Sequence, residues 1–145
     1  MNVMSNNSKE KILYLTKFDL VRLQDLLVVA KAYDVVGDKH LDELQKALQQ
    51  SKILPQEEMP SDIVTMNTKV VLTALTTIQE FAYTLVYPSE ASIEQNKVSI
   101  LSPMGTSMIG CKIGDIVEWQ DPSGLRRMKI INILYQPEAA GDYHL

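Results

Sequence analysis

The sequence predicts an α+β fold: a short antiparallel helical hairpin followed by a mostly antiparallel sheet with one short helix. Three observations predict it. Leucines recur at helical spacing in the first third of the chain. After residue 62, runs rich in β-branched and aromatic residues alternate with turn residues. Between these regions, Pro55 and Pro60 bracket an acidic segment through which a helix cannot continue.

The composition is typical of one folded domain or of a compact domain with a small appendage. The chain has 145 residues, of which 46% are hydrophobic and 22% are charged. The net charge is −4 and no basic stripe interleaves with aromatic residues, which disfavours direct binding of DNA. A single cysteine and the absence of a long apolar run predict a cytoplasmic protein without a membrane helix.

The first helix is predicted over residues 17–33. Thr16 is placed to cap its start. The stripe that it would bury follows a spacing of three and four residues, and it consists of Leu20, Leu23, Leu27 and Ala30, widened by Leu26, Val29 and Tyr33. The residues before it, 1–11, are expected to form a disordered tail.

The second helix is predicted over residues 39–51, because Gly37 suits a helix exit and Asp38 can cap a new helix. Leu41, Leu44 and Leu48 repeat the helical spacing. The connection is so short that the helices must run antiparallel with their leucine stripes facing each other. The hairpin should therefore occupy residues 12–54, with a linker over residues 55–61.

The third part, residues 62–145, is predicted to contain the sheet. Its expected strands cover residues 64–72, 81–87, 97–101, 115–120 and 125–135. Residues 73–79 and the run Asp121-Pro122-Ser123-Gly124 should form turns. A helix over residues 103–110 is expected to cover the last strand, since Ser102 can cap it and Pro103 suits its first position.

Residues 97–115, KVSILSPMGTSMIGCKIGD, resemble the C-terminal signature of the Gre transcription elongation factors. The likeness continues through the Val-Glu-Trp run 117–119 and the Pro-Ser-Gly run 122–124. Further stretches, DIVTMNT at 62–68, TLVYP at 84–88 and YQPEAAGDY at 135–143, are similar to the regulators of nucleoside diphosphate kinase. Those regulators share the Gre C-terminal domain but have a shortened coiled coil.

The resemblance implies an FK506-binding-protein-like C-terminal domain that docks on bacterial RNA polymerase near its secondary channel. DNA would be contacted only indirectly, through the transcription complex, and the protein should be a monomer. The polymerase-contacting residues carried over from the family are Ser102, Pro103, Met104 and Gly105. In this family the helical arm projects into the channel, so this chain should bind there and compete with Gre-type factors.

The tip of the hairpin decides between regulation and transcript cleavage. By position it consists of Tyr33, Asp34, Val35, Val36 and Asp38. Metal-assisted hydrolysis requires closely placed carboxylates, whereas the two aspartates here straddle two valines and a glycine. We therefore expect no catalytic, cofactor-binding or metal-binding residue, with a transcript-cleavage factor and a peptidyl-prolyl isomerase-like binding module as alternatives.

The remaining candidate sites favour structural roles. Gly105 and Gly110 are spaced like a phosphate loop, but Cys111 stands where its lysine would be. His40 and His144 are the only histidines, too few for a zinc motif. Cys111 is expected to fill the core, and residues 136–145 are expected to pack back on the domain.

Overall fold

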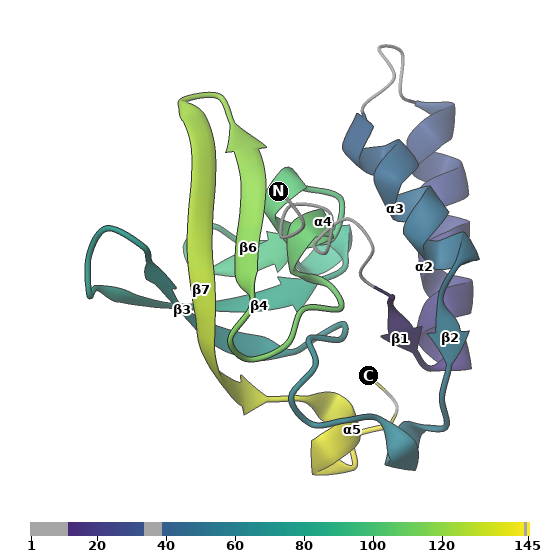
Figure 1. The fold of residues 1–145 in the computed structure, drawn as a ribbon. Coiled ribbons are helices and arrows are strands. Elements are labelled where there is room, and N and C mark those ends of the chain that lie inside the picture. Colours follow the sequence, from purple (N-terminus) through teal and green to yellow (C-terminus); the bar gives the residue numbers. More distant parts are fainter. Residues whose placement is uncertain (1–11, 34–38, 144) are drawn as a thin grey trace, which may run out of the picture.

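The computed structural model describes residues 12–33, 39–143 and 145 of the chain. A pair of antiparallel helices stands beside a five-stranded sheet (Figure 1). The helices are α2 (Lys17–Ala32) and α3 (Lys39–Gln49), which together we call the arm. Both predicted helices are confirmed, and their ends agree with the prediction to within two residues. The expected tail, residues 1–11, lies outside the described residues.

The inner faces of the arm helices hold a leucine cluster. Leu23 and Leu27 of α2 and Leu41, Leu44 and Leu48 of α3 are all buried. Burial of a leucine side chain contributes about 1.5–3 kcal/mol to folding. The facing leucine stripes predicted for the hairpin are therefore confirmed.

The predicted widening of the buried α2 stripe is wrong at two positions. Val29 is 56% exposed and Tyr33 is 82% exposed. At 100° per residue, Val29 lies on nearly the opposite side of the helix from Leu23 and Leu27. Apolar character alone therefore did not reveal which side of α2 faces the core.

The foot of the arm is closed by a small parallel sheet that was not predicted. β1 (Tyr14–Leu15) pairs with β2 (Lys52–Ile53), so the chain entering the arm lies beside the chain leaving it. Strands of two residues are too short to show a periodic pattern. A 3₁₀ turn, η1 (Gln56–Glu58), follows in the predicted linker.

The sheet has the strand order β5-β4-β3-β7-β6. Its strands are β3 (Lys69–Ala74), β4 (Glu80–Val86), β5 (Lys97–Ser99), β6 (Ile116–Asp121) and β7 (Gly124–Tyr135). Neighbouring strands are antiparallel except for the parallel pair β4 and β5. A 3₁₀ turn, η2 (Pro88–Glu90), follows β4. The mixed α+β architecture is confirmed, while the FK506-binding-protein-like character stays a prediction.

The first predicted strand, residues 64–72, begins too early. Residues 65–68 form a turn in which the Thr65 amide donates to the Thr68 hydroxyl at 3.0 Å. Asn67 takes a left-handed conformation with φ of 66°. Threonine and asparagine side chains can replace strand hydrogen bonds in this way, so β3 starts only at Lys69.

The short helix α4 (Pro103–Met108) is confirmed, but it packs differently from the prediction. It lies against β6 and β5 rather than covering the last strand. On β7, Met128 and Ile130 are buried whereas Leu134 is 54% exposed. The register of β7 on β3 shifts between Val71 and Leu72, so buried and exposed side chains do not alternate regularly along this strand.

The C-terminal tail packs back on the domain as predicted, and it also forms a second short helix that was not predicted. This helix, α5 (Pro137–Ala140), ends at Gly141, whose φ is 79°. Gln136 anchors the segment, since its amide donates to the carbonyls of Pro60 and Ile63 at 2.7 Å each. The tail therefore lies beside η1, at the junction of the linker and the sheet (Figure 1).

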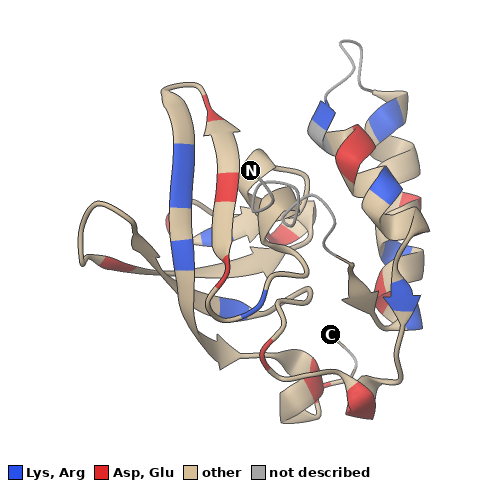
Figure 2. Ribbon diagram, in the orientation of Figure 1, with Lys and Arg blue, Asp and Glu red and all other residues tan. Residues whose placement is uncertain are grey.

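Charged residues are spread over many elements (Figure 2). Arg126 and Arg127 on β7 are paired with Asp121 and Glu118 of β6 at 3.1 and 3.0 Å. Within the described ranges, no helix combines the length and apolar composition needed to cross a membrane.

Candidate functional site

The first candidate site is the turn that begins α4. The Ser102 hydroxyl accepts a hydrogen bond from the Gly105 amide at 3.0 Å and donates to the Ser99 carbonyl at 2.7 Å. The Thr106 hydroxyl donates to the Ile100 carbonyl at 2.7 Å. These bonds satisfy free amides at the helix start and fix the helix to the end of β5. The predicted capping role of Ser102 is confirmed.

Gly105 is required where α4 approaches β5. A Cβ atom at this position would lie 1.9 Å from the Ser99 carbonyl oxygen, far inside van der Waals contact. Any larger residue would push the helix away from the strand. The structure thus gives Ser102 and Gly105 roles in holding the turn together.

Two side chains of the same turn are open to a partner. Pro103 is exposed and Met104 is partly buried against the core. The structure therefore brings all four sequence-predicted residues into one rigid turn, and it places two of them where a partner could touch them.

The second candidate site is the arm tip. Tyr33 projects at the end of α2 with 82% of its surface exposed. Asp34, Val35, Val36 and Asp38 lie outside the described residues.

A buried polar joint, which sequence reasoning missed, connects the arm to the sheet. The Tyr87 hydroxyl donates to the Asp19 carboxylate at 3.0 Å. Burial raises the pKa of Asp19 from 3.8 to about 6, against the opposing effects of the Tyr87 bond and of Arg22. Burial likewise raises the pKa of the Tyr87 hydroxyl well above its usual range. The sequence signal for this joint is an aspartate on a helix face that otherwise carries leucines.

Arg22 extends the joint toward the tail. Its guanidinium stacks over the Tyr87 ring at 4.0 Å and over the Phe18 ring at 4.8 Å. It also donates to the Leu145 carbonyl at 3.1 Å, which accepts a second bond from the Asn67 amide. One arm residue thus contacts both the sheet domain and the tail.

Glu138 closes the joint from the tail side. Its carboxylate accepts from the Thr65 hydroxyl at 2.8 Å, and Thr65 also bonds the Thr68 hydroxyl at 2.9 Å. All three side chains are buried. Because buried polar groups are costly unless paired, this set holds the tail against the segment that leads into β3.

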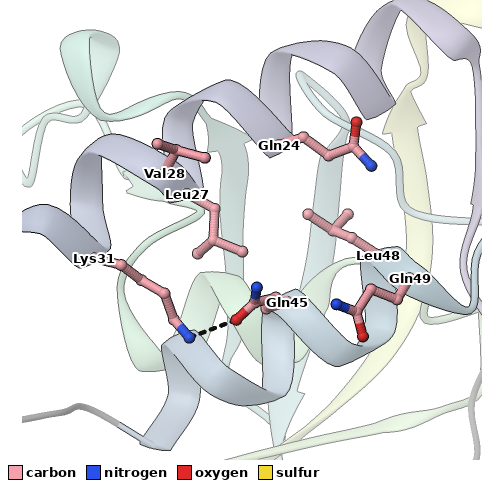
Figure 3. Close-up of a pocket in the computed structure, with 7 residues that line it drawn as sticks. All are labelled: Gln24, Leu27, Val28, Lys31, Gln45, Leu48 and Gln49. Carbon is pink, nitrogen blue, oxygen red and sulfur yellow. Dashed lines mark hydrogen bonds between the residues drawn. The ribbon is translucent and has the colours of Figure 1, made fainter.

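A cleft of about 240 Å³ opens between the two arm helices (Figure 3). Leu27 and Leu48 supply apolar groups to the cleft. The remaining lining residues are Gln24, Val28, Lys31, Gln45 and Gln49. Lys31 is held in place by Asp42 at 2.6 Å and Gln45 at 2.5 Å, so its charge is already balanced.

The described part of the chain contains no group of three or more potential metal ligands. Cys111 is 4% exposed and its thiol donates to the Ser107 carbonyl at 3.2 Å, which confirms the predicted place in the core. His144 lies outside the described residues. The features that the described residues form are a hydrogen-bonded turn at the start of α4, an arm of two helices and a cleft between them.

Comparison with known proteins decides the family. Residues 59–135 match the family model described as "Transcription elongation factor, GreA/GreB, C-term". The chain belongs to the GreA/GreB family. The matched range contains the whole sheet and the α4 turn, as the resemblance of residues 97–115 predicted.

Relatives of this GreA/GreB family member include the regulator of nucleoside diphosphate kinase of Escherichia coli K12. That protein is 35% identical over 122 residues, which are 83% of this chain and 88% of the relative. The transcription elongation factor GreA of Chloroherpeton thalassium is 34% identical over 104 residues, 72% of this chain and 66% of that relative. Both predicted resemblances are confirmed.

A solved structure of similar fold is the prokaryotic transcription elongation factor GreA/GreB from Nitrosomonas europaea. It aligns with a TM-score of 0.72 and 31% sequence identity, covering 86% of this chain and 98% of that chain. The combination of arm and sheet in one chain is therefore shared with a GreA/GreB protein. This family consists of regulatory proteins.

Proposed function

We propose that this chain binds bacterial RNA polymerase near its secondary channel and competes there with Gre-type factors without cleaving transcripts. The observation that carries the proposal is the short arm of a GreA/GreB family member. α2 has 16 residues, and at 1.5 Å per residue it spans only about 24 Å. An arm of this length can obstruct the entrance of the polymerase secondary channel, but it extends only a short distance into the channel.

The two parts of the fold would have different roles in this function. The sheet domain, residues 62–145, would dock through the exposed Pro103 and the half-buried Met104 of the α4 turn. The hairpin, residues 12–54, would stand in the channel entrance, with residues 55–61 linking the two. Obstructing the channel requires a surface complementary to the polymerase and a fixed orientation of the arm, and the buried joint at Asp19 supports the fixed orientation.

Absence of cleavage is proposed from the tip sequence. Two carboxylates that hold a catalytic magnesium ion must lie close together. In the sequence, Asp34 and Asp38 are separated by two valines and a glycine, and Asp38 is the residue expected to cap the second helix. The protein would thus regulate without cleaving. It would act as a cytoplasmic monomer and would reach DNA only through the transcription complex.

A stalled, backtracked elongation complex tests the proposal. The protein should inhibit GreA-stimulated transcript shortening in proportion to its concentration, and should cause no shortening by itself with magnesium present. Shortened transcripts in the absence of GreA would instead establish the cleavage alternative.

The docking turn is tested by pull-down with core polymerase. Pro103→Glu adds one negative charge at an exposed first position of α4, where a carboxylate suits the helix. Ser123→Glu adds the same charge at the exposed turn between β6 and β7 and is the matched control. Only Pro103→Glu should weaken binding. Equal binding by both variants would remove the turn from the docking surface.

A further inference from the structure

One side of α2 is apolar and faces solvent. Phe18, Val21, Val28 and Val29 are 44%, 45%, 71% and 56% exposed, and Tyr33 at the helix end is 82% exposed. At 100° per residue these side chains fall within one arc, opposite Leu23 and Leu27. We call this arc, which also contains Asp25, the outer face of α2.

The outer face is unusual for a helix on the surface of a small protein. Surface helices normally bury one apolar stripe and turn polar residues to water. Single exposed apolar residues are ordinary, but a contiguous exposed set marks an interaction surface. α3 follows the ordinary pattern, with Lys39, Glu43 and Lys46 exposed on the side opposite its leucines.

The outer face adjoins the cleft of the arm at Val28, which belongs to both (Figure 3). The cleft volume of about 240 Å³ can accept an aliphatic side chain. Energetically important contacts in protein interfaces concentrate where an anchor side chain enters such a pocket. The cleft and the outer face thus form one continuous surface along the arm.

The charges of this surface indicate the chemistry of its partner. Asp25 is the exposed carboxylate of α2, and it lies midway between Phe18 and Ala32. Arg22 is engaged with Tyr87 and Leu145, and Lys31 with Asp42. A basic group in the partner would therefore meet an available acid at the centre of the surface.

The same position of Asp25 disfavours a second copy of this chain as the occupant. An antiparallel copy centred on the outer face would place the two Asp25 carboxylates against each other in an apolar interface. Like charges brought together in this way are costly. A copy shifted along the helix would leave much of the apolar surface uncovered.

We propose that the outer face of α2 and the adjoining cleft form the surface by which the arm binds a protein partner. The partner presents an aliphatic side chain to the cleft and a lysine or arginine to Asp25. Under the proposed function, on which this inference rests, the partner is the polymerase wall beside the arm. α2 then faces this wall, while the polar side of α3 faces solvent.

Charge reversal provides a matched test. Asp25→Lys on α2 and Glu43→Lys on α3 each replace an exposed acid by lysine, so both change the net charge equally. Affinity for purified core polymerase is measured for the full-length variants by biolayer interferometry at two salt concentrations. Asp25→Lys should weaken binding about tenfold at low salt and less at high salt, whereas Glu43→Lys should change it less than about twofold.

A second variant tests the apolar part of the surface. Val28→Gln leaves the charge unchanged and should weaken binding about tenfold as an interface-centre residue. Equal effects of Asp25→Lys and Glu43→Lys, or full binding by Val28→Gln, would overturn the inference while leaving the proposed function intact. Absence of binding by the unmodified protein would overturn both. Dimers in sedimentation that Val28→Gln dissociates would assign the surface to a second copy instead.

Discussion

The two helices of the arm are neighbours in sequence and space, yet they distribute their side chains differently. α3 is amphipathic: its three leucines are buried and its outer side is polar. α2 also buries Leu23 and Leu27, but it exposes valines and aromatic residues on the opposite side. At its foot α2 alone carries the polar joint, through Asp19 and Arg22.

Within the hairpin, the residues that stabilise the fold and the residues that we propose bind a partner therefore lie on different sides of the helices. The inner sides of both helices suffice to hold the hairpin together, so the outer side of α2 is free to serve another purpose. The joint at its foot then fixes the direction in which that outer side points. α3 completes the core and turns its polar side to solvent.

The largest expected effect tests whether the inner sides are equivalent. Leu23→Ala in α2 and Leu44→Ala in α3 remove side chains that are 0% and 1% exposed. Each should lower the free energy of unfolding by about 2–5 kcal/mol, because a leucine and its contacts are lost from a packed interior. Urea denaturation measures both. A loss below about 1 kcal/mol in only one variant would show that the hairpin core depends on a single helix.

The next effect concerns the joint that only α2 possesses. The pKa of Asp19 is raised from 3.8 to about 6 in the folded state, so the folded protein binds a proton more tightly than the unfolded chain. Between these values the free energy of unfolding therefore falls as the pH rises. The loss corresponds to roughly 2 kcal/mol between pH 4 and pH 7.

Asp19→Asn isolates this contribution, since its amide oxygen can still accept from the Tyr87 hydroxyl. Unfolding measured from pH 4 to pH 7 should show the unmodified protein losing stability relative to Asp19→Asn. Asp25→Asn on the exposed side is the control: it keeps Asp19, so its stability should follow the same pH dependence as that of the unmodified protein. Parallel curves for Asp19→Asn and the unmodified protein would mean that the carboxyl is not held protonated by burial.

The same contrast explains which features were predictable from sequence. Leucine spacing predicted both helices, and Ser102 with Pro103 predicted the start of α4, because local periodicity and capping decide these elements. Val29 was assigned to the wrong side, because α2 has two apolar sides and periodicity alone does not show which of them is buried. The pairing of Asp19 with Tyr87 joins residues 68 positions apart, a separation that no local pattern records.

A smaller effect is expected at the start of α2. Thr16 accepts a hydrogen bond from the Asp19 amide at 3.1 Å and is buried. Thr16→Ala should cost about 1 kcal/mol of unfolding free energy because one helix amide loses its partner. Thr16→Ser retains the oxygen and should cost less. Equal losses in the two variants would assign the effect to the lost methyl group rather than to the cap.

The smallest effect on stability is expected for Val28→Gln, and its comparison with Leu27→Gln distinguishes the two sides of α2. Leu27 and Val28 are consecutive, 4% and 71% exposed, and both line the cleft. Leu27→Gln should destabilise the protein by more than about 2 kcal/mol, because it places an amide in the leucine cluster. Val28→Gln should stay within about 0.5 kcal/mol of the unmodified protein, since surface substitutions rarely exceed this range. Thermal and urea unfolding of the two variants measure the difference. A large loss for Val28→Gln would mean that the outer side of α2 contributes to the fold, and its apolar character would then need no partner to explain it.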